Sequence, residues 1–467
     1  MQNPALSLAL LPLIIIAALQ SPRSVRAAEI TPGQLVEGLA CRSDPTQTYT
    51  LYLPSRYTST KRWPALLVFD PRGRSVHAAE IFQRAAEEYG WLILSSDNTR
   101  SDGPWEPNNR AMRAMWPELF ERWSADPHRI YAAGFSGGAM AALALAEMTQ
   151  QLAGIIGAGG RIPDGLKIAQ TGYAHFGAAG LTDFNYSEMW KLDELLAKRG
   201  NTHRMEVFEG RHQWLPESLA TLAVEWLELE AMRQGVRPLD TEFVGRLYSE
   251  EMAAARELES TDRGLEALWR YQTISRTFGA LRDIRDVVHK VAKLESNRTV
   301  VREGKDRQHW DAWERRYSSR LAKGSSLIKD PESETSPREL LATFGINDLK
   351  KRVGKGGYEG IVSKRVLERI WTHTSFYLTR DLLAQKRYWD AMTTLSVAVE
   401  IRDDSSFAWY NLACAAARSG SRKRALEALE KAIDLGFRDL AHISGDEDLE
   451  SLRKEPRYLE LMEELSR

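Results

Sequence analysis

The sequence predicts an α/β fold, with a doubly wound and mostly parallel sheet, followed by an all-α region. Three observations lead to this prediction. Short apolar runs alternate with helical patterns from about residue 47 to residue 234. Strand signals stop after Gly235, where charged helical patterns take over. Near the C terminus, a pattern of small residues recurs at a fixed spacing. Apolar strands separated by helices are typical of a parallel sheet covered on both faces.

The α/β domain is expected over residues 28–235. Its strands are expected at 48–53, 65–69, 91–94, 129–133, 153–158, 173–176 and 204–208, where apolar or alternating runs occur. Helical spacing lies between them at 78–89, 112–123, 139–148 and 220–232. The segment 161–171 is too short to hold an inserted lid, so we expect an open site that suits a bulky or surface-bound substrate.

The rest of the chain is expected to be helical. Residues 236–370 form a helical connecting region, with a linker near 323–338 that contains glycine, serine and two prolines. Within residues 371–467, the small and apolar positions Ala391, Leu395 and Ala398 recur as Ala425, Leu429 and Ala432. This spacing resembles the tetratricopeptide repeat, in which small residues let two antiparallel helices approach closely. The resemblance implies a protein or peptide partner on the repeat helices.

Composition excludes several classes of function. Lys and Arg number 63 and Asp and Glu number 64, so the net charge of −1 argues against nucleic acid as the main partner. Two cysteines exclude a disulfide-rich scaffold and an all-cysteine zinc site. The nine histidines show no His-Glu-x-x-His spacing. We therefore expect neither a metal nor a cofactor.

The N terminus resembles a targeting segment. An uncharged apolar run over residues 6–19 is followed by small residues near Ala27, which predicts a secretory signal peptide over residues 1–27. The run is short for a membrane span. We expect a periplasmic or secreted protein with no stable membrane span after signal removal. A retained membrane anchor is the alternative, because the first five residues carry no Lys or Arg.

A candidate nucleophile lies where a strand meets a helix. The segment Gly134-Phe135-Ser136-Gly137-Gly138 follows an apolar strand and precedes an alanine-rich helix. Glycines on both sides of the serine allow a sharp turn that projects its hydroxyl above the sheet. The following helix N-terminus offers free amides and a positive dipole to an oxyanion. We therefore predict Ser136 as a nucleophile and the Gly137 amide as an oxyanion donor.

A nucleophilic serine needs a base, and the base needs an acid that orients it. Catalytic groups of open parallel sheets lie beyond the carboxyl ends of the strands. His212 follows the last strand of the domain, whereas His203 precedes that strand and His175 lies inside another. Asp183 lies on the loop after the penultimate strand. Placement therefore predicts His212 as the base and Asp183 as its orienting acid.

Residues 45–234 resemble the α/β-hydrolase superfamily. The resemblance is carried by Tyr52-Leu-Pro-Ser-Arg-Tyr57, Asp126-Pro-His-Arg-Ile-Tyr131 with the turn at Ser136, Gly180-Leu-Thr-Asp183 and Gly210-Arg-His-Gln-Trp214. The order Ser136, Asp183, His212 is that of this fold. The segments are most similar to secreted esterases that group with polyhydroxybutyrate depolymerases and feruloyl esterases. The resemblance implies hydrolysis of a small-molecule or polymer-borne ester through an acyl-serine intermediate.

The chain departs from this family at the second oxyanion donor. Such esterases have a His-Gly pair where this chain has Asp70-Pro71-Arg72-Gly73. Pro71 has no amide hydrogen, so the donor is expected from Arg72, Gly73 or a side chain. Asp70, Asn98, Trp105 and Trp214 lie on loops at the same edge of the sheet and are candidate substrate-binding residues.

Two other functions remain compatible with these patterns. The chain could be a serine peptidase on the same fold, because the triad serves both reactions. It could also be a repeat scaffold with an inactive hydrolase domain, since the Asp70-Pro71 loop departs from the family.

Overall fold

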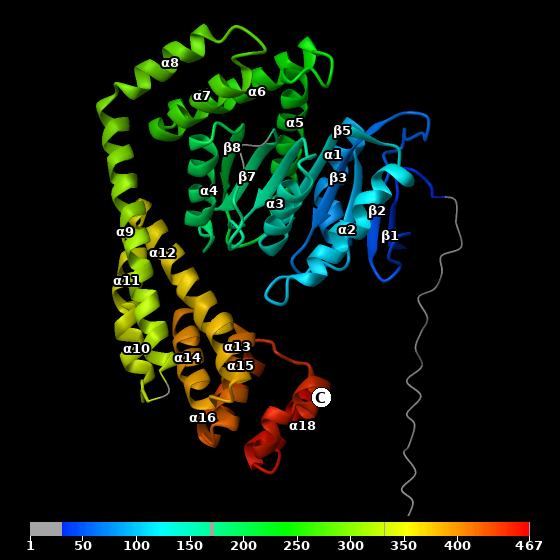
Figure 1. Cartoon of the computed structure of the whole chain (residues 1–467). Coiled ribbons are helices and arrows are strands. Elements are labelled where there is room, and N and C mark those ends of the chain that lie inside the picture. The colour runs from blue at the N-terminus through cyan, green and yellow to red at the C-terminus, as the bar shows by residue number, and fades with distance from the viewer. Residues whose placement is uncertain (1–29, 169–171, 331, 467) are drawn as a thin grey trace, which may run out of the picture.

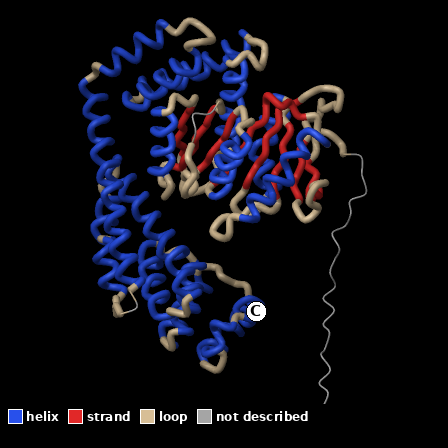
Figure 2. The backbone as a smooth tube through the Cα atoms, viewed as in Figure 1, coloured by secondary structure: helices blue, strands red, loops and turns tan. Residues whose placement is uncertain are grey.

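The computed structural model describes residues 30–168, 172–330 and 332–466. The signal peptide expected over residues 1–27 lies outside the described residues. Figures 1 and 2 show a sheet domain followed by a helical region that arches around one end of it. In the described part of the chain, no helix is both long enough and apolar enough to cross a bilayer.

The sheet is eight-stranded and mostly parallel. Its strands are β1 (Leu35–Ala40), β2 (Thr48–Tyr52), β3 (Trp63–Phe69), β4 (Leu92–Ser96), β5 (Ala125–Phe135), β6 (Gly154–Ala158), β7 (Ala174–Gly180) and β8 (His203–Phe208). Their order across the sheet is β1-β2-β4-β3-β5-β6-β7-β8. Strands β1, β2 and β4 pair antiparallel, and all pairs from β4 through β3 to β8 are parallel.

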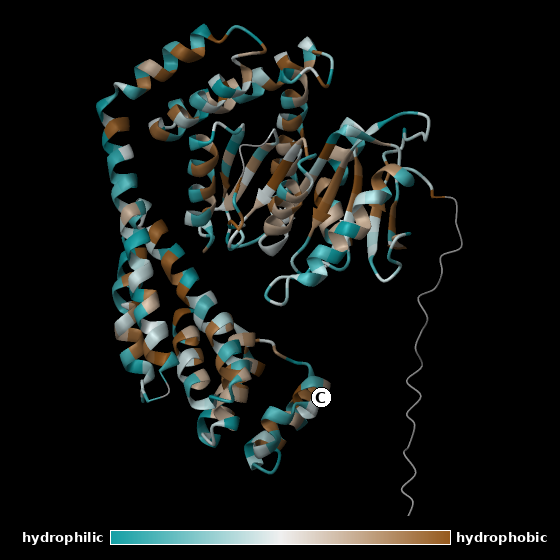
Figure 3. Cartoon of the chain, in the orientation of Figure 1, coloured by the Kyte–Doolittle hydropathy of each residue, from teal (hydrophilic) through white to brown (hydrophobic). Residues whose placement is uncertain are grey.

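Helices cover both faces of the sheet. They are α1 (Ser75–Tyr89), α2 (Glu106–Glu121), α3 (Gly137–Thr149), α4 (Tyr186–Lys198) and α5 (Glu217–Arg233). Helices α2, α3 and α4 pack on one face and α1 and α5 on the other. Strand β3 shows why both faces are covered, because Leu67 contributes to one core and Leu66 and Val68 to the other. Its hydrophobic colour in Figure 3 fits this position. The predicted fold class is confirmed.

Strand β1 is the element of the sheet that the sequence analysis missed. It lies at the sheet edge, and its pairing with β2 shifts register between Val36 and Leu39. Gly38 in this shift has a φ of +64°. An edge strand with a bulge has no regular alternation of buried and exposed residues. The pattern by which strands are recognised is therefore absent.

The helical region contains two further cores. Its helices are α6 (Thr241–Ser260), α7 (Gly264–Phe278), α8 (Arg285–Glu295), α9 (Arg298–Lys329), α10 (Pro337–Phe344), α11 (Ile346–Val353), α12 (Gly357–Thr372), the π-helix η1 (His373–Tyr377), α13 (Leu378–Ala384), α14 (Tyr388–Ile401), α15 (Ser406–Arg418), α16 (Arg422–Asp434), α17 (Leu440–Gly445), the 3₁₀-helix η2 (Glu447–Leu452) and α18 (Pro456–Ser466). The end of α5, α6 to α8 and the start of α9 share one core, and the end of α9 shares the other with α10 to α18.

Helix α9 joins the two cores and changes the expected linker. It begins after Asn297, whose side chain caps the amides of Thr299 and Val300. It continues to Lys329, so the linker expected near 323–338 is shorter and lies between Lys329 and Pro337. Gly324 lies inside this helix and against the ring of Phe344, where a Cβ would lie 2.3 Å from that ring. The glycine permits close packing there and does not end the helix.

The two repeat units correspond to helix pairs. The unit with Ala425, Leu429 and Ala432 contains α15 and α16, and the unit with Ala391, Leu395 and Ala398 contains α13 and α14. Ala391, Leu395 and Ala398 are fully buried, as are Ala425, Leu429 and Ala432. Small buried residues let the paired helices pack closely, as the spacing predicts. The assignment to the tetratricopeptide family stays a prediction.

Candidate active site

Ser136 stands on a strained turn between β5 and α3. Its φ is +53° and its ψ is −118°, a conformation that non-glycine residues seldom adopt. The glycines on both sides are required by close packing. A Cβ on Gly134 would lie 2.1 Å from the carbonyl carbon of Gly138, and a Cβ on Gly138 would lie 1.8 Å from the carbonyl oxygen of Phe69. The predicted strand–turn–helix geometry is therefore present.

His212 and Asp183 complete a hydrogen-bonded chain with Ser136. His212 Nε2 lies 2.9 Å from Ser136 Oγ, and His212 Nδ1 lies 2.8 Å from Asp183 Oδ1. Asp183 is fully buried, while the His212 side chain keeps 18% exposure. Asp183 follows β7 and His212 follows β8, so parallel strands bring both to one edge of the sheet. The structure thus brings together three residues predicted from the sequence.

Two aromatic rings pack against the His212 imidazole. The ring centroid of Phe184 lies 4.0 Å from that of His212, and the centroid of Phe135 lies 4.6 Å from it. Phe135 and Phe184 neighbour Ser136 and Asp183 in sequence. Ser136 and Asp183 therefore each have a sequence neighbour whose ring packs on the His212 imidazole and restricts its orientation. Fixed orientation is what a general base requires.

The other two histidines that follow Ser136 within the domain, His175 and His203, lie where the sequence placed them. His175 is buried inside β7, and burial lowers its pKa to about 4. It is therefore neutral at physiological pH. His203 begins β8, at the opposite edge of the sheet from His212, and its Nδ1 lies 2.9 Å from the carbonyl oxygen of Asn201.

The loop after β3 differs from the expectation. Asp70 is fully buried, and its carboxylate accepts hydrogen bonds from the Arg72 amide (2.8 Å), the Arg74 guanidinium (2.9 Å) and Trp214 Nε1 (2.8 Å). The Gly73 amide donates to the Asp70 carbonyl at 3.1 Å. Both amides considered for the oxyanion are thus engaged within their own loop. This argues against Arg72 as an oxyanion donor.

Asp70 and Trp214 have a bracing function in place of the expected substrate contact. Their hydrogen bond ties the loop after β3 to the segment that carries His212, two residues before Trp214. The ring of Trp214 also packs on Phe135, with centroids 5.8 Å apart. Neither residue lines the cavity beside Ser136. A buried carboxylate with this many donors is favoured in the charged form because the donors replace the lost water.

Replacement of Asp70 by asparagine is expected to destabilise the protein in a pH-dependent way. Burial raises the pKa of Asp70, but the hydrogen bonds from Arg74, Trp214 and the Arg72 amide outweigh it and lower the pKa below its usual 3.8. The charged form therefore stabilises the fold above that value, and the stabilisation is lost as the pH falls through the lower folded pKa.

Asp70→Asn should lower the free energy of unfolding by about 1–3 kcal/mol at neutral pH. Urea unfolding at neutral pH and at about pH 3 measures the difference. The difference in free energy of unfolding between the wild type and Asp70→Asn should be smaller in acid than at neutral pH. If this difference were the same at both pH values, the charge of Asp70 would not be the source of the stabilisation.

Of the remaining candidates, Trp105 lines the cavity and Asn98 does not. The Asn98 side chain accepts from the Thr48 amide at 2.7 Å and so fixes the start of β2. Asn98 is therefore a structural residue of the loop after β4. The sequence showed that both residues follow β4, but it could not show which side chain faces the site.

A cavity of about 1140 Å³ lies between Ser136 and the helical region. The sheet domain contributes Ser136, Gly137, Met140, Ala144, Trp105 and the segment from Arg161 to Leu166. The helical region contributes Ser318, Leu321, Arg369, Thr372, His373, Tyr377 and Arg380. Figure 1 shows the C-terminal helices opposite the loops at the carboxyl ends of the strands. The open site expected from the short segment 161–171 is therefore corrected, because distant helices form its opposite wall.

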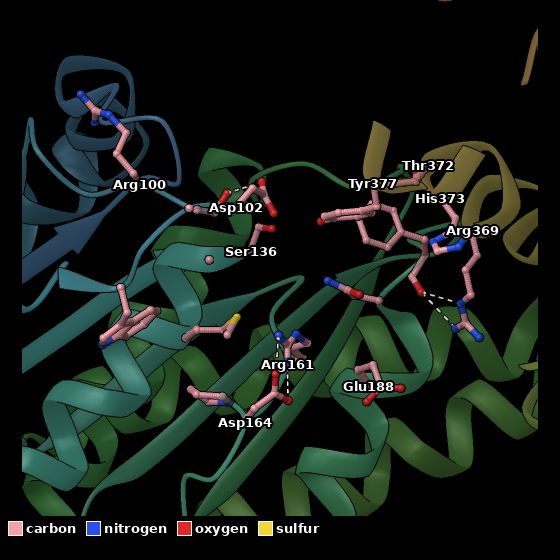
Figure 4. A pocket seen from close by; sticks show the side chains of 18 of the residues that line it. Arg100, Asp102, Ser136, Arg161, Asp164, Glu188, Arg369, Thr372, His373 and Tyr377 are labelled. Carbon is pink, nitrogen blue, oxygen red and sulfur yellow. Dashed lines mark hydrogen bonds and ion pairs between the residues drawn. The ribbon is translucent and has the colours of Figure 1, made fainter. Parts of the chain in front are cut away.

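The π-helix η1 presents part of that wall. Thr372, His373 and Tyr377 lie on or beside it, and all three line the cavity. Figure 4 shows Tyr377 directed across the cavity toward Asp102 and Ser136. Burial and the Asp102 carboxylate raise the pKa of Tyr377 to about 12, so its hydroxyl keeps its proton. π-helical turns occur often at functional sites. A glycine-free helical pattern gave no signal for this turn in the sequence.

No family model and no curated protein matches the chain. Its fold is similar to that of solved α/β enzymes at low identity. An esterase of Pyrobaculum calidifontis is 13% identical and covers 43% of this chain and 86% of its own, with a TM-score of 0.36. A fluorophosphonate-binding serine hydrolase of Staphylococcus aureus is 13% identical (42% and 98%, TM-score 0.35). A ferulic acid esterase is 14% identical (42% and 97%, TM-score 0.34).

Proposed function

We propose that this protein is a serine hydrolase that cleaves carboxylic esters through an acyl-serine intermediate. The observation that carries the proposal is the hydrogen-bonded chain from Ser136 through His212 to buried Asp183, built on a strained turn at the carboxyl edge of the sheet. Strain of this kind persists where the surrounding structure enforces it, and it is common at active sites. The triad supports the proposal without any contribution from the similar structures.

The proposed reaction begins at Ser136. His212 Nε2 accepts the hydroxyl proton while Ser136 Oγ attacks the ester carbonyl carbon. The Gly137 amide stands in the first turn of α3, where amides have no partner within the helix, and it donates to the oxyanion. His212 then protonates the leaving alcohol. Water then attacks the acyl-serine while His212 accepts a proton from it. His212 returns that proton to Ser136 Oγ as the acid is released. Asp183 holds the imidazole orientation throughout.

The cavity supports a bulky substrate, either a small molecule or an ester borne on a polymer. Its volume of about 1140 Å³ exceeds the range of about 300–1,000 Å³ typical of small-molecule sites. Trp105, Met140 and Leu166 offer apolar surface near the nucleophile, which suits an acyl or aromatic group. The leader expected over residues 1–27 supports export of the protein to the periplasm or medium.

The repeat helices are proposed to bind a protein or peptide partner. Phe407 is 70% exposed and Trp389 is 53% exposed, although both are large apolar side chains on these helices. Exposed aromatic residues are enriched in interfaces. Pull-down with wild-type protein and Phe407→Ser should show a partner that the variant loses.

A fluorescent fluorophosphonate tests the proposed activity directly. The purified protein should be labelled on one residue and should hydrolyse short p-nitrophenyl esters, whereas His212→Ala should lose both properties. Peptide anilides assayed in parallel separate an esterase from a peptidase. A folded wild-type protein that is neither labelled nor active on either substrate would show an inactive domain in a scaffold protein.

A further inference from the structure

The loop that carries Asp183 is held by a helix from the other region of the chain. This loop joins β7 to α4, and side chains of α12 contact it. Arg369 of α12 donates to the Phe184 carbonyl oxygen through Nε (3.2 Å) and Nη2 (3.0 Å), and Nη2 also donates to Ser187 Oγ (2.7 Å). Arg365, one turn earlier, donates to the Leu181 carbonyl oxygen at 3.4 Å. The two arginines thus contact the backbone on both sides of Asp183.

A buried carboxylate fixes both arginines. Glu314 of α9 is 2% exposed, and its Oε2 accepts from Arg365 Nε (3.0 Å) and Nη2 (2.7 Å). Its Oε1 lies 3.4 Å from Arg369 Nη2. Arg365 has no exposed side-chain area. Its guanidinium carbon lies 3.9 Å from the centre of the ring of Tyr186, which is the first residue of α4. A paired and fully buried arginine has few alternative conformations, so Arg365 contacts the loop in a fixed orientation.

The contacted loop bears directly on His212. Asp183 accepts the imidazole hydrogen bond, and the next residue, Phe184, packs its ring on that imidazole while its carbonyl oxygen accepts from Arg369. A shift of Phe184 would therefore move two of the contacts that orient the base. Loops between a strand and a helix are otherwise among the more mobile parts of a domain.

We propose that Arg369 and Arg365 of α12 are positioning residues, which hold the Asp183 loop so that His212 is aligned with Ser136. The inference rests on the proposed serine-hydrolase function and extends it, because the helical region then becomes part of the catalytic machinery. Misplacement of catalytic groups by about 1 Å can cost about a hundredfold in rate. The arrangement explains why a hydrolase domain is braced by a segment some 185 residues later in the chain.

The test compares three variants and one control variant of the whole protein. Arg369→Gln removes the donors to Phe184 and Ser187, and Arg369→Lys keeps a cation that can reach one of the acceptors. Ser187→Ala removes a single hydrogen bond and leaves the ion pairs intact. Arg270→Gln is the matched control, since Arg270 also joins the helical region to the sheet domain, through Glu206 on β8 at 3.0 Å, without touching the Asp183 loop.

The readouts separate positioning from unfolding and from substrate contact. Arg369→Gln should lower kcat for p-nitrophenyl acetate and the rate constant of fluorophosphonate labelling by about ten- to a hundredfold, with KM little changed. Both rates are expressed per titrated active site, so unfolded molecules do not count. Arg369→Lys should recover part of the rate, Ser187→Ala should lose less, and Arg270→Gln should match the wild type.

Hydrogen exchange gives a readout that needs no catalysis. Amides of residues 182–187 should exchange faster in Arg369→Gln than in the wild type or in Arg270→Gln. Unchanged exchange and unchanged per-site rates in Arg369→Gln would overturn the positioning role while the proposed function stood. A raised KM with unchanged kcat would overturn it too, because Arg369 would then act as a substrate contact. If the wild type were neither labelled nor active, but amides 182–187 exchanged faster in Arg369→Gln, the contact of Arg369 with the loop would stand. The proposed hydrolase function would then be overturned.

Discussion

Replacement of Ser136 by alanine is expected to lower kcat by about 10⁶-fold, the largest effect of any single change in this protein. The alcohol nucleophile is lost, while the cavity and the Gly137 amide remain. A residual acceleration of about 10³–10⁴ over the uncatalysed reaction should therefore persist. Steady-state hydrolysis of p-nitrophenyl acetate, corrected for trace wild-type enzyme by fluorophosphonate titration, measures the loss.

The triad hypothesis also predicts how this change combines with a second one. Ser136→Ala with His212→Ala should be little slower than Ser136→Ala alone, because residues that act as a unit are strongly non-additive. Alanine meets the same strained φ of +53° as serine, so thermal unfolding of Ser136→Ala should match the wild type within a few degrees. If the reductions in kcat caused by the two single changes multiplied in the double variant, proton transfer between the two side chains would be contradicted.

Replacement of Arg365 by methionine is expected to lower the free energy of unfolding by about 3–5 kcal/mol. Glu314 would keep its buried charge and lose its two shortest ion-pair contacts, leaving Arg369 at 3.4 Å as its partner. The free energy is measured by urea unfolding, with loss of helical signal and of tryptophan fluorescence recorded together.

The double variant Arg365→Met, Glu314→Leu serves as the control for that prediction. Removal of both charges leaves no uncompensated buried ion, so the double variant should recover most of the lost stability. Its activity should stay low, because Arg365 and the support of Arg369 are both gone. A single variant as stable as the wild type would show that this pair contributes nothing to the fold.

The triad could be predicted because each of its members has a local signal. Ser136 stands between glycines at a strand–helix junction, and Asp183 and His212 each follow an apolar strand. Parallel strands place such positions at one edge of a sheet whatever the loop details. Elimination of His175 and His203 used the same rule, and the observed placement of both residues agrees with it.

The loop after β3 could not be predicted in the same way. Arg72 was expected to donate to an oxyanion, but its amide donates to Asp70, whose other oxygen accepts from Trp214. Asp70 and Trp214 are 144 residues apart. A local sequence pattern cannot show that a loop amide already donates to a side chain. That hydrogen bond depends on how the loop after β3 packs against the segment after β8.

The sequence by itself determined the α/β fold class, the helical character of the second region and the three candidate catalytic residues. These follow from hydrophobic period, turn residues and chain order, which are local properties. Only the tertiary structure decided that α12 contacts the Asp183 loop and that Arg369, His373 and Tyr377 line the cavity beside Ser136. Those contacts depend on how the helical region packs against the sheet domain. A helix's period fixes which of its residues share a face, but not which distant surface that face will meet.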